Sequence, residues 1–448
     1  MYDILSAIMK TQFKPFRAIR FSDQIESPAD VLAPPYDVIS PDEQQALYKR
    51  HDQNIVRLDF GTQYLTDTPE DNRYSRASIH LEAWLMDGTL GRDSDPSYYL
   101  YEHSYQADGQ TRHLRGILGA GKLFQFEEGV VIPHENTMPG PIEDRLELTK
   151  ACEANLSPIY TLFDDAEGAF FNLTSAVWTL APTTDLTTQS GDQYRLWKVS
   201  DESLISQLYH FLEQKKLLIA DGHHRYTTAL HFRDYCRKTT QSSDPLSDYT
   251  LMFATPLQNE GLTIYPTHRV VFDLPDFNPQ VFRGRLEEFF EISLVADVTA
   301  FHAEAATRAS KSIGVSIPGE STVWLLNLKP LSNIRGFFPE GASDVLRGLD
   351  VSILQNIILQ GILGYSLDDI RAQRRIRYLK SDQAVVDAVA TGSVQAAFVL
   401  QATRLDEMRD VCLNGEKMPQ KSTYFYPKLI TGLVINPVSP LETAAGGL

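Results

Sequence analysis

One short segment constrains the fold and the chemistry of this chain more than any other: "LLIADGHHRY", residues 217–226. Four apolar residues precede Asp221 and Gly222, and apolar residues then recur at spacings of three and four. A short apolar run, a glycine-containing polar turn and a helical pattern predict a strand, a tight turn and a helix. Proteins that alternate strands and helices usually place their chemistry at such strand ends.

The polar residues of this turn suit a phosphate group. Gly222 lets the backbone turn sharply, and the helix, which we expect to begin near Arg225, offers N–H groups without helical partners at its start. Arg225 adds a planar fork, and His223 and His224 add imidazole donors. Asp221 offers an oxygen to Mg²⁺ or to a substrate hydroxyl. The alternative is a simple helix cap with surface histidines. Because five such residues are crowded together, we favour a functional site.

Further candidate residues lie in other segments. His134 and Glu135 in "VVIPHENTMPGPIEDR" follow an apolar run, so Glu135 is a candidate general base, with an exposed salt bridge as the alternative. The candidates for substrate contact are Asp37 in "LAPPYDV", His134, Arg145, His268 and Arg269 in "YPTHRVV", and Lys421, Ser422 and Thr423 in "KMPQKSTYFYPK".

Several of the substrate candidates have a structural alternative. Asp37 could belong to a rigid proline-fixed turn, and for His268 and Arg269 we favour a surface pair. Lys421 and its hydroxyl neighbours resemble the end of a P-loop, but the upstream glycines are missing and the following aromatic residues and proline exclude a helix. A Walker A site is therefore rejected. The segment could be a basic, hydroxyl-rich loop that contacts the substrate, and the alternative is an aromatic strand with solvated lysines.

Charge and cysteine content limit the possible partners. The formal net charge of -17 opposes non-specific binding to nucleic acids or anionic membranes, although a small anion could still bind in a local basic pocket. The three cysteines are far apart without metal-binding spacing, no run approaches the roughly 20 apolar residues of a membrane span, and the N-terminus lacks a signal-peptide pattern. We predict a cytoplasmic protein, for which Met9 could be the start. The sequence leaves the oligomeric state open.

The 448 residues suffice for more than one core, and strands and helices alternate, so we predict a mixed α/β protein. The expected subdomains are an N-terminal α/β part at 9–128, a core at 129–272 with an insertion at 166–210, and a C-terminal α/β part at 273–448. Residues 275–345 show little pattern.

Several elements have clear local signals. Ser40, Ser381 and Thr403 are expected helix N-caps, and Asp108 with Gly109 marks a hairpin turn. A helical stretch is expected at 350–375. The basic run "RAQRRIRYLK", residues 371–380, is interpreted as a solvated helix face.

With these residues in view, the chain resembles a large prokaryotic family catalogued as domain of unknown function 1015 (DUF1015). The segments that carry the resemblance are "KPFRAIRF", "LAPPYDVIS", "PHENTMPGPIEDR", "NLSPIYTLF", "ADGHHRYTTAL", "YPTHRVV" and "MPQKSTYFYPKLITGLV". This resemblance supplies no established activity.

A second resemblance concerns residues 131–165 and 215–238. The order P-H-E, D-R, S-P-I and D-G-H-H-R is similar to the core of the ParB and sulfiredoxin superfamily, and most similar to its free-serine kinases. Such a resemblance implies a ParB/sulfiredoxin-like core between the N-terminal and C-terminal subdomains. Sulfiredoxins need a cysteine at the position that His223 occupies in this chain, so a sulfiredoxin activity is excluded. No DNA-binding module like that of ParB is visible.

The superfamily resemblance also implies roles for individual residues. His223, His224 and Arg225 would contact nucleotide phosphates, Asp221 would bind a metal or the substrate, and Glu135 would be the catalytic base. We therefore expect a phosphotransferase that uses ATP or another donor such as ADP, CTP or pyrophosphate, with Mg²⁺, to phosphorylate a small hydroxyl-bearing metabolite, with free serine as the leading example. The alternatives are a nucleotide-binding regulatory protein and a metal-dependent phosphoesterase.

Overall fold

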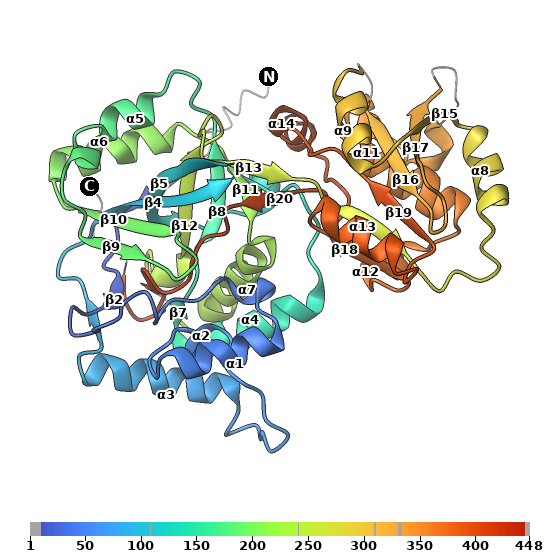
Figure 1. The fold of residues 1–448 in the computed structure, drawn as a ribbon. Coiled ribbons are helices and arrows are strands. Elements are labelled where there is room, and N and C mark those ends of the chain that lie inside the picture. The colour runs from blue at the N-terminus through green and yellow to red at the C-terminus, as the bar shows by residue number, and fades with distance from the viewer. Residues whose placement is uncertain (1–9, 108, 241, 309–310, 330–333, 444–448) are drawn as a thin grey trace. The chain divides into compact units, whose positions relative to one another are not determined.

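The computed structural model describes residues 10–107, 109–240, 242–308, 311–329 and 334–443. Met9 and Asp108, named above, lie outside the described residues. Helices and strands alternate along the chain, so the mixed α/β class is confirmed (Figure 1).

The chain forms two compact units. Unit 1 consists of Met1–Pro133, Thr137–Thr263 and Pro427–Leu448, and unit 2 of His134–Asn136 and Ile264–Tyr426. Each unit thus combines segments that are distant in the chain, whereas the sequence prediction used three consecutive segments.

A nine-stranded sheet forms the centre of unit 1. Its strands in order are β6 (Val131–Ile132), β11 (Leu217–Asp221), β8 (Ile159–Phe163), β12 (Tyr249–Pro256), β5 (Gln110–Lys122), β4 (Tyr98–Ala107), β10 (Gln193–Val199) and β9 (Thr184–Thr187), and β1 (Phe13–Lys14) also pairs with β5. The β6–β11 and β8–β12 pairs are parallel, and the other pairs are antiparallel. The predicted hairpin is confirmed as β4 and β5.

Three helices bury apolar side chains in one core together with side chains of this sheet. They are α5 (Ala169–Thr174), α6 (Glu202–Glu213) and α7 (His223–Thr239). In α6, Ile205, Leu208 and Leu212 recur at spacings of three and four and belong to the same core cluster as Ile219 of β11. Burial of such a stripe stabilises the helix more than its intrinsic propensity does. Tyr226, Ala229 and Leu230 of α7 belong to the same cluster, so packing holds both elements that flank Gly222.

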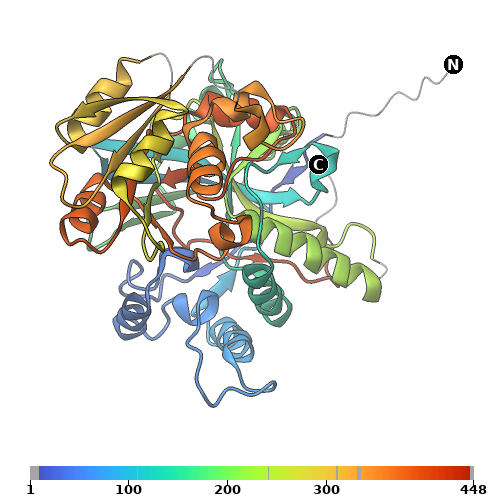
Figure 2. The same ribbon diagram turned by 90° about the vertical axis from the view of Figure 1, so that its right-hand side faces the viewer.

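A second group of helices builds a smaller core in unit 1. It comprises α1 (Pro41–Arg50), α2 (Val56–Asp59), α3 (Arg73–Met86) and α4 (Pro139–Cys152), and the first three are the blue helices that lie together in Figures 1 and 2. The Ser40 hydroxyl accepts a hydrogen bond from the Glu43 N–H, which confirms this predicted cap. Leu81, Trp84 and Leu148 join α3 to α4 in this core.

Unit 2 contains a six-stranded antiparallel sheet. Its strands in order are β15 (Phe290–Val295), β17 (Val323–Leu328), β16 (Ser312–Ser316), β19 (Ala396–Val399), β14 (His268–Val271) and β18 (Ile376–Leu379). Helices α9 (Val298–Ala306) and α13 (Asp382–Ala390) supply apolar side chains to one core cluster with this sheet. On α8 (Pro279–Glu287), Phe282 packs instead against Trp324 and Phe398.

The remaining short elements connect these layers. They are β2 (Ile19–Phe21), η1 (Tyr36–Val38), β3 (Leu90–Arg92), η2 (Phe126–Glu128), β7 (Ala154–Asn155), η3 (Val177–Thr179), η4 (Leu246–Asp248), β13 (Thr263–Tyr265), η5 (Arg335–Phe337), α10 (Asp344–Gly348), β20 (Tyr424–Tyr426) and β21 (Asn436–Pro437). Within the described ranges, no helix is long and apolar enough to cross a membrane.

The helical stretch expected at 350–375 is not uniform. Helix α11 (Asp350–Ile353) continues as a π-helix, η6 (Leu354–Ile362), which is followed by α12 (Leu367–Arg371). The basic run 371–380 is not a helix face, because α12 ends at Arg371 and the chain then turns into β18.

The predicted cap of α14 (Leu405–Leu413) is also wrong. The Thr403 hydroxyl donates to the carbonyl of Ser422, and Glu407 accepts from the Arg404 N–H at the helix start. In contrast, the Ser381 hydroxyl accepts from the Ala384 N–H at the start of α13, as predicted.

Two glycines test this packing by a matched substitution. A Cβ atom at Gly261 would overlap the backbone oxygen of His113, whereas a Cβ at Gly140 in α4 would meet no atom within 4 Å. We expect Gly261→Ala to lower the free energy of unfolding by about 1–3 kcal/mol through overpacking. Gly140→Ala should leave it unchanged or raise it by up to about 1 kcal/mol, since alanine favours helix. Urea denaturation measures both, and equal stabilities would contradict the packing.

Candidate functional site

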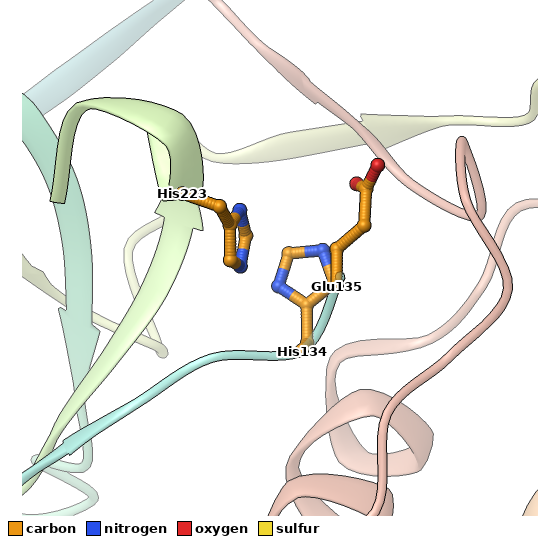
Figure 3. Close-up of side chains that lie close together, drawn as sticks. All are labelled: His134, Glu135 and His223. Atoms are coloured by element: carbon orange, nitrogen blue, oxygen red, sulfur yellow. The ribbon is translucent and has the colours of Figure 1, made fainter. Parts of the chain in front are cut away.

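The turn between β11 and α7 has the predicted strand, glycine and helix. Gly222 has a φ of +93°, and a Cβ there would lie 3.0–3.1 Å from the guanidinium of Arg225, so the position requires glycine. Helix α7 begins at His223, two residues before the expected start at Arg225. Gly222 is the N-cap residue of this helix. His223 is buried at this helix start (Figure 3). The first N–H groups of a helix lack partners within the helix and favour a negative charge.

Asp221 holds two cations at the end of β11. Its Oδ1 accepts from the Lys428 Nζ at 2.9 Å, and its Oδ2 accepts from the Arg225 Nη2 at 3.0 Å. Burial alone would raise the pKa of Asp221, but the charges of Lys428 and Arg225 outweigh burial and hold this pKa far below its ordinary value. The three side chains together carry a net positive charge.

Two further contacts fix the start of α7. Arg225 donates to the carbonyl oxygen of Pro158, which precedes β8. The Nε2 of His224 accepts a hydrogen bond of 3.0 Å from the Met138 N–H at the start of α4, so in this arrangement that ring nitrogen is an acceptor. His224 thus positions the helix instead of offering this nitrogen to a ligand.

A cavity of about 40 Å³ lies beside Arg225 in unit 1, and Asp59 and Arg145 also line it. Arg145 contacts Asp59 at 3.3 Å and Asp144 at 2.6 Å, and its guanidinium lies 4.1 Å from the ring centre of Tyr36. Burial raises the pKa of Asp59, and among the described residues its Oδ2 has no hydrogen-bond partner. The structure therefore brings Arg145 and Arg225 to one small polar cavity.

One acidic residue of this region was a sequence candidate, and another was not. Asp37 is exposed on η1, and its carboxylate forms no ion pair with the described residues, although its charge acts on Tyr36 and Asp59. Asp59 was missed altogether. Its only sequence signal is a single acid at the end of the apolar run "NIVRLDFG".

In unit 2, His134 and Glu135 are held by the 418–423 segment. His134 Nε2 lies 2.9 Å from Thr423 Oγ1, and the His134 carbonyl accepts from the Met418 N–H at 2.8 Å. The Lys421 N–H is directed to Glu135 Oε1 at 3.4 Å, with Lys421 in the left-handed region at a φ of +57°. Such a conformation is uncommon for a residue with a Cβ atom.

His268 and Arg269 are buried in β14 and are not the surface pair that we favoured, since β14 lies between β18 and β19. Arg269 donates to the carbonyls of Thr267 and, at 2.9 Å, Lys421, so it supports the same segment. The Ser422 hydroxyl donates to the Pro419 carbonyl there.

His268 is engaged elsewhere, because neighbouring residues of a strand point to opposite faces. Its Nε2 lies 3.1 Å from Asp382, and its Nδ1 accepts from the Leu400 N–H. Burial lowers the pKa of His268 to about 4, so this imidazole is neutral at pH 7. The structure thus groups His134, Glu135, Arg269, Lys421, Ser422 and Thr423, but not His268.

Strands β6 and β11 end together in unit 1. In the parallel register, Val131 pairs with Leu217 and Ile132 with Leu218, so both strands end at the same edge of the sheet. In the sequence, Pro133, His134 and Glu135 follow β6.

Solved structures give distant similarities. A "Free serine kinase in complex with AMP" matches with 14% identity and a TM-score of 0.34, over 68% of this chain and 89% of that chain. A "Conserved hypothetical protein from Pyrococcus furiosus" matches with 13% identity and a TM-score of 0.33, over 68% and 92%. "SbnI with C-terminal truncation from Staphylococcus aureus" matches with 13% identity and a TM-score of 0.35, over 71% and 87%.

No curated protein matches the chain. A protein family described as "Protein of unknown function (DUF1015)" matches over residues 13–352, which is most of the sequence. This chain therefore belongs to the DUF1015 family.

Proposed function

We propose that this protein is a phosphotransferase, which transfers a phosphoryl group from a nucleotide or pyrophosphate to the hydroxyl of a small metabolite such as free serine. The observation that supports this proposal most is the cationic group at the start of α7. Arg225 and Lys428 share one carboxylate, Asp221, beside the N–H groups of the first helical turn. An excess cation at a helix N-terminus favours a phosphate group.

This arrangement suits phosphoryl transfer because the reaction needs mainly alignment and charge neutralisation. Asp221 holds both cations in fixed positions before a ligand arrives. A phosphate that approaches them therefore avoids much of the cost of ordering two long side chains. His223, at the first position of α7, would add an imidazole donor.

Glu135 is the proposed general base. The acceptor oxygen would form a bond to the terminal phosphorus of the donor while the bond from that phosphorus to the leaving phosphate oxygen breaks. The hydroxyl proton would pass to the Glu135 carboxylate. The Lys421 N–H would orient this carboxylate, and His134 would be oriented by Thr423.

Mg²⁺ belongs to the proposal as a partner of the donor phosphates. Both oxygens of Asp221 already face cations, so Asp221 would offer one ligand at most, and the phosphates would supply others. When bound, Mg²⁺ would neutralise charge that develops on the phosphate oxygens. The test of this part is whether donor binding weakens when EDTA removes divalent cations.

The base assignment predicts a large and selective loss of activity. Glu135→Gln should lower the rate of phosphoryl transfer about 10²- to 10⁴-fold, because the amide cannot accept the proton. The dissociation constant of the donor should change little. The measurement combines turnover of labelled donor with hydroxy amino acids and calorimetric binding of the donor.

Glu127→Gln is the control, since Glu127 is an exposed residue of η2. If Glu135→Gln keeps the activity of this control, Glu135 is not the base. Slow donor hydrolysis that no metabolite stimulates, unchanged in both variants, would favour a nucleotide-binding regulatory protein instead.

The phosphate site predicts a dependence on the shape of the Arg225 side chain. Arg225→Lys keeps the charge but loses the fork that reaches both Asp221 and Pro158, so donor binding should weaken about tenfold or more. A ligand that binds only the folded state raises its thermal stability, so a thermal-shift titration with ATP, ADP, CTP and pyrophosphate measures the effect.

Arg237→Lys, on the same helix, is the matched control, because Arg237 pairs with Asp248. An equal ligand-induced shift in the two variants and the wild type would place the donor phosphates away from Arg225.

A further inference from the structure

A second cavity, of about 190 Å³, lies wholly within unit 2. This volume is more than ten times the roughly 10–15 Å³ that one water molecule requires, so a small metabolite fits. The residues that line it are Asn136, Phe338, Pro339, Leu346, Ser352, Gln355, Asn356, Leu367, Ile370, Arg371, Lys417, Met418, Pro419 and Gln420.

The polar lining of this cavity favours an anionic ligand. Arg371 and Lys417 are exposed cations, and Asn136, Gln355, Asn356 and Gln420 add amides that can both donate and accept. No acidic residue is among the described residues of the lining. Arg371 also has Asp368 at 3.6 Å, which leaves its planar fork near the cavity only partly neutralised. A carboxylate is a good match for such a fork.

The inner wall of the cavity contains an unsatisfied hydroxyl. Ser352 is completely buried, and its Oγ has no hydrogen-bond partner among the described residues. A buried polar group without a partner costs free energy, so a position of this kind is normally satisfied by water or a ligand. Ser352 is one of the residues around the cavity, but it has no exposed surface, so it shapes the wall and its hydroxyl does not itself face a ligand.

The backbone around Ser352 is unusual in the same place. The π-helix η6 begins two residues later, and its Gln355 and Asn356 line the cavity, with the Asn356 Nδ2 donating to the Ser352 carbonyl at 2.8 Å. π-Helical turns are rare and are frequent at functional sites, because they redirect side chains that a regular helix would place elsewhere.

This cavity adjoins the segment of the proposed base. Asn136, which follows Glu135 directly, lines it. Met418 also lines it and donates through its N–H to the His134 carbonyl at 2.8 Å. Gln420 lines it as well and precedes Lys421, whose N–H is directed to Glu135. A ligand in this cavity would therefore lie next to the Glu135 segment.

We propose that this cavity binds the acceptor, and that the acceptor is a small hydroxyl-bearing carboxylic acid, such as a hydroxy amino acid. Arg371 and Lys417 bind its carboxylate, and the amides bind its remaining polar groups. The identity of the ligand as an acceptor rests on the proposed function, whereas the recognition of a carboxylate rests on the cavity alone.

The test uses the full-length protein and three probes that differ by one group. L-Serine has both the carboxylate and the hydroxyl, ethanolamine lacks the carboxylate, and L-alanine lacks the hydroxyl. Binding is measured by calorimetry, and phosphoryl transfer is measured with each probe as acceptor. The variants are Arg371→Met and Lys417→Met, with Arg374→Met as the control, because Arg374 is an exposed arginine three residues away that does not line the cavity.

The expected result is tight binding of L-serine and L-alanine relative to ethanolamine by the wild type. Arg371→Met should weaken L-serine binding about tenfold or more and remove most of the preference over ethanolamine, since one charge-assisted hydrogen bond accounts for such a factor. The KM of L-serine should rise by a similar factor with a smaller change in kcat. Arg374→Met should behave like the wild type, and circular dichroism should show all variants folded.

The outcomes separate the cavity from the proposed function. If L-serine is phosphorylated but neither Arg371→Met nor Lys417→Met changes its KM, the acceptor binds elsewhere and the cavity proposal is overturned. If carboxylates bind in an Arg371-dependent manner but no donor yields a phosphorylated product, the carboxylate site stands and the phosphotransferase proposal fails. If the wild type does not discriminate between L-serine and ethanolamine, carboxylate recognition is refuted.

Discussion

The ion group of Asp221, Arg225 and Lys428 holds together the parts of unit 1 on which the candidate site depends. Asp221 ends β11, Arg225 lies in the first turn of α7, and Lys428 belongs to the C-terminal segment, 207 residues along the chain. The side chains are mostly buried, with 19%, 11% and 14% of their surfaces exposed, respectively. Loss of one partner from a buried group of charges leaves the others uncompensated, which costs more than the pair contributes. The start of α7 is therefore fixed by charge as well as by packing.

Local sequence signals were sufficient to predict those parts of the fold that depend on interactions between residues close together in the chain. The glycine turn at 222, the cap at Ser40 and the β4–β5 hairpin all follow from neighbouring residues. The sheet of unit 2 did not follow, because its strands are short and come from segments as distant as β14 and β19. The π-helix was equally invisible, since its apolar spacing resembles that of an ordinary helix.

The candidate site was only partly predictable for the same reason. The turn 221–225 was identified because its polar residues are adjacent, but Lys428, which pairs with Asp221, comes from the far end of the chain. Asp59 lies in an apolar run that gave no warning of its buried contact with Arg145. His268 and Arg269 were expected at the surface because both are polar, but β14 lies between two other strands and buries both side chains. Because they are neighbours in a strand, their side chains point to opposite faces of the sheet.

Two residues that the sequence suggested for substrate contact, Arg269 and Lys421, and the expected helix cap Thr403 all take part in one loop. Arg269 donates to backbone carbonyls, Thr403 bonds to Ser422, and Lys421 keeps a left-handed conformation. A loop fixed by buried bonds holds its N–H groups in place without a ligand, and such preorganisation lowers the cost of orienting a carboxylate like Glu135. Arg269 and its neighbours therefore act on any chemistry of Glu135 through position, and substitutions there should be judged by their effect on the loop before they are interpreted as lost substrate contacts.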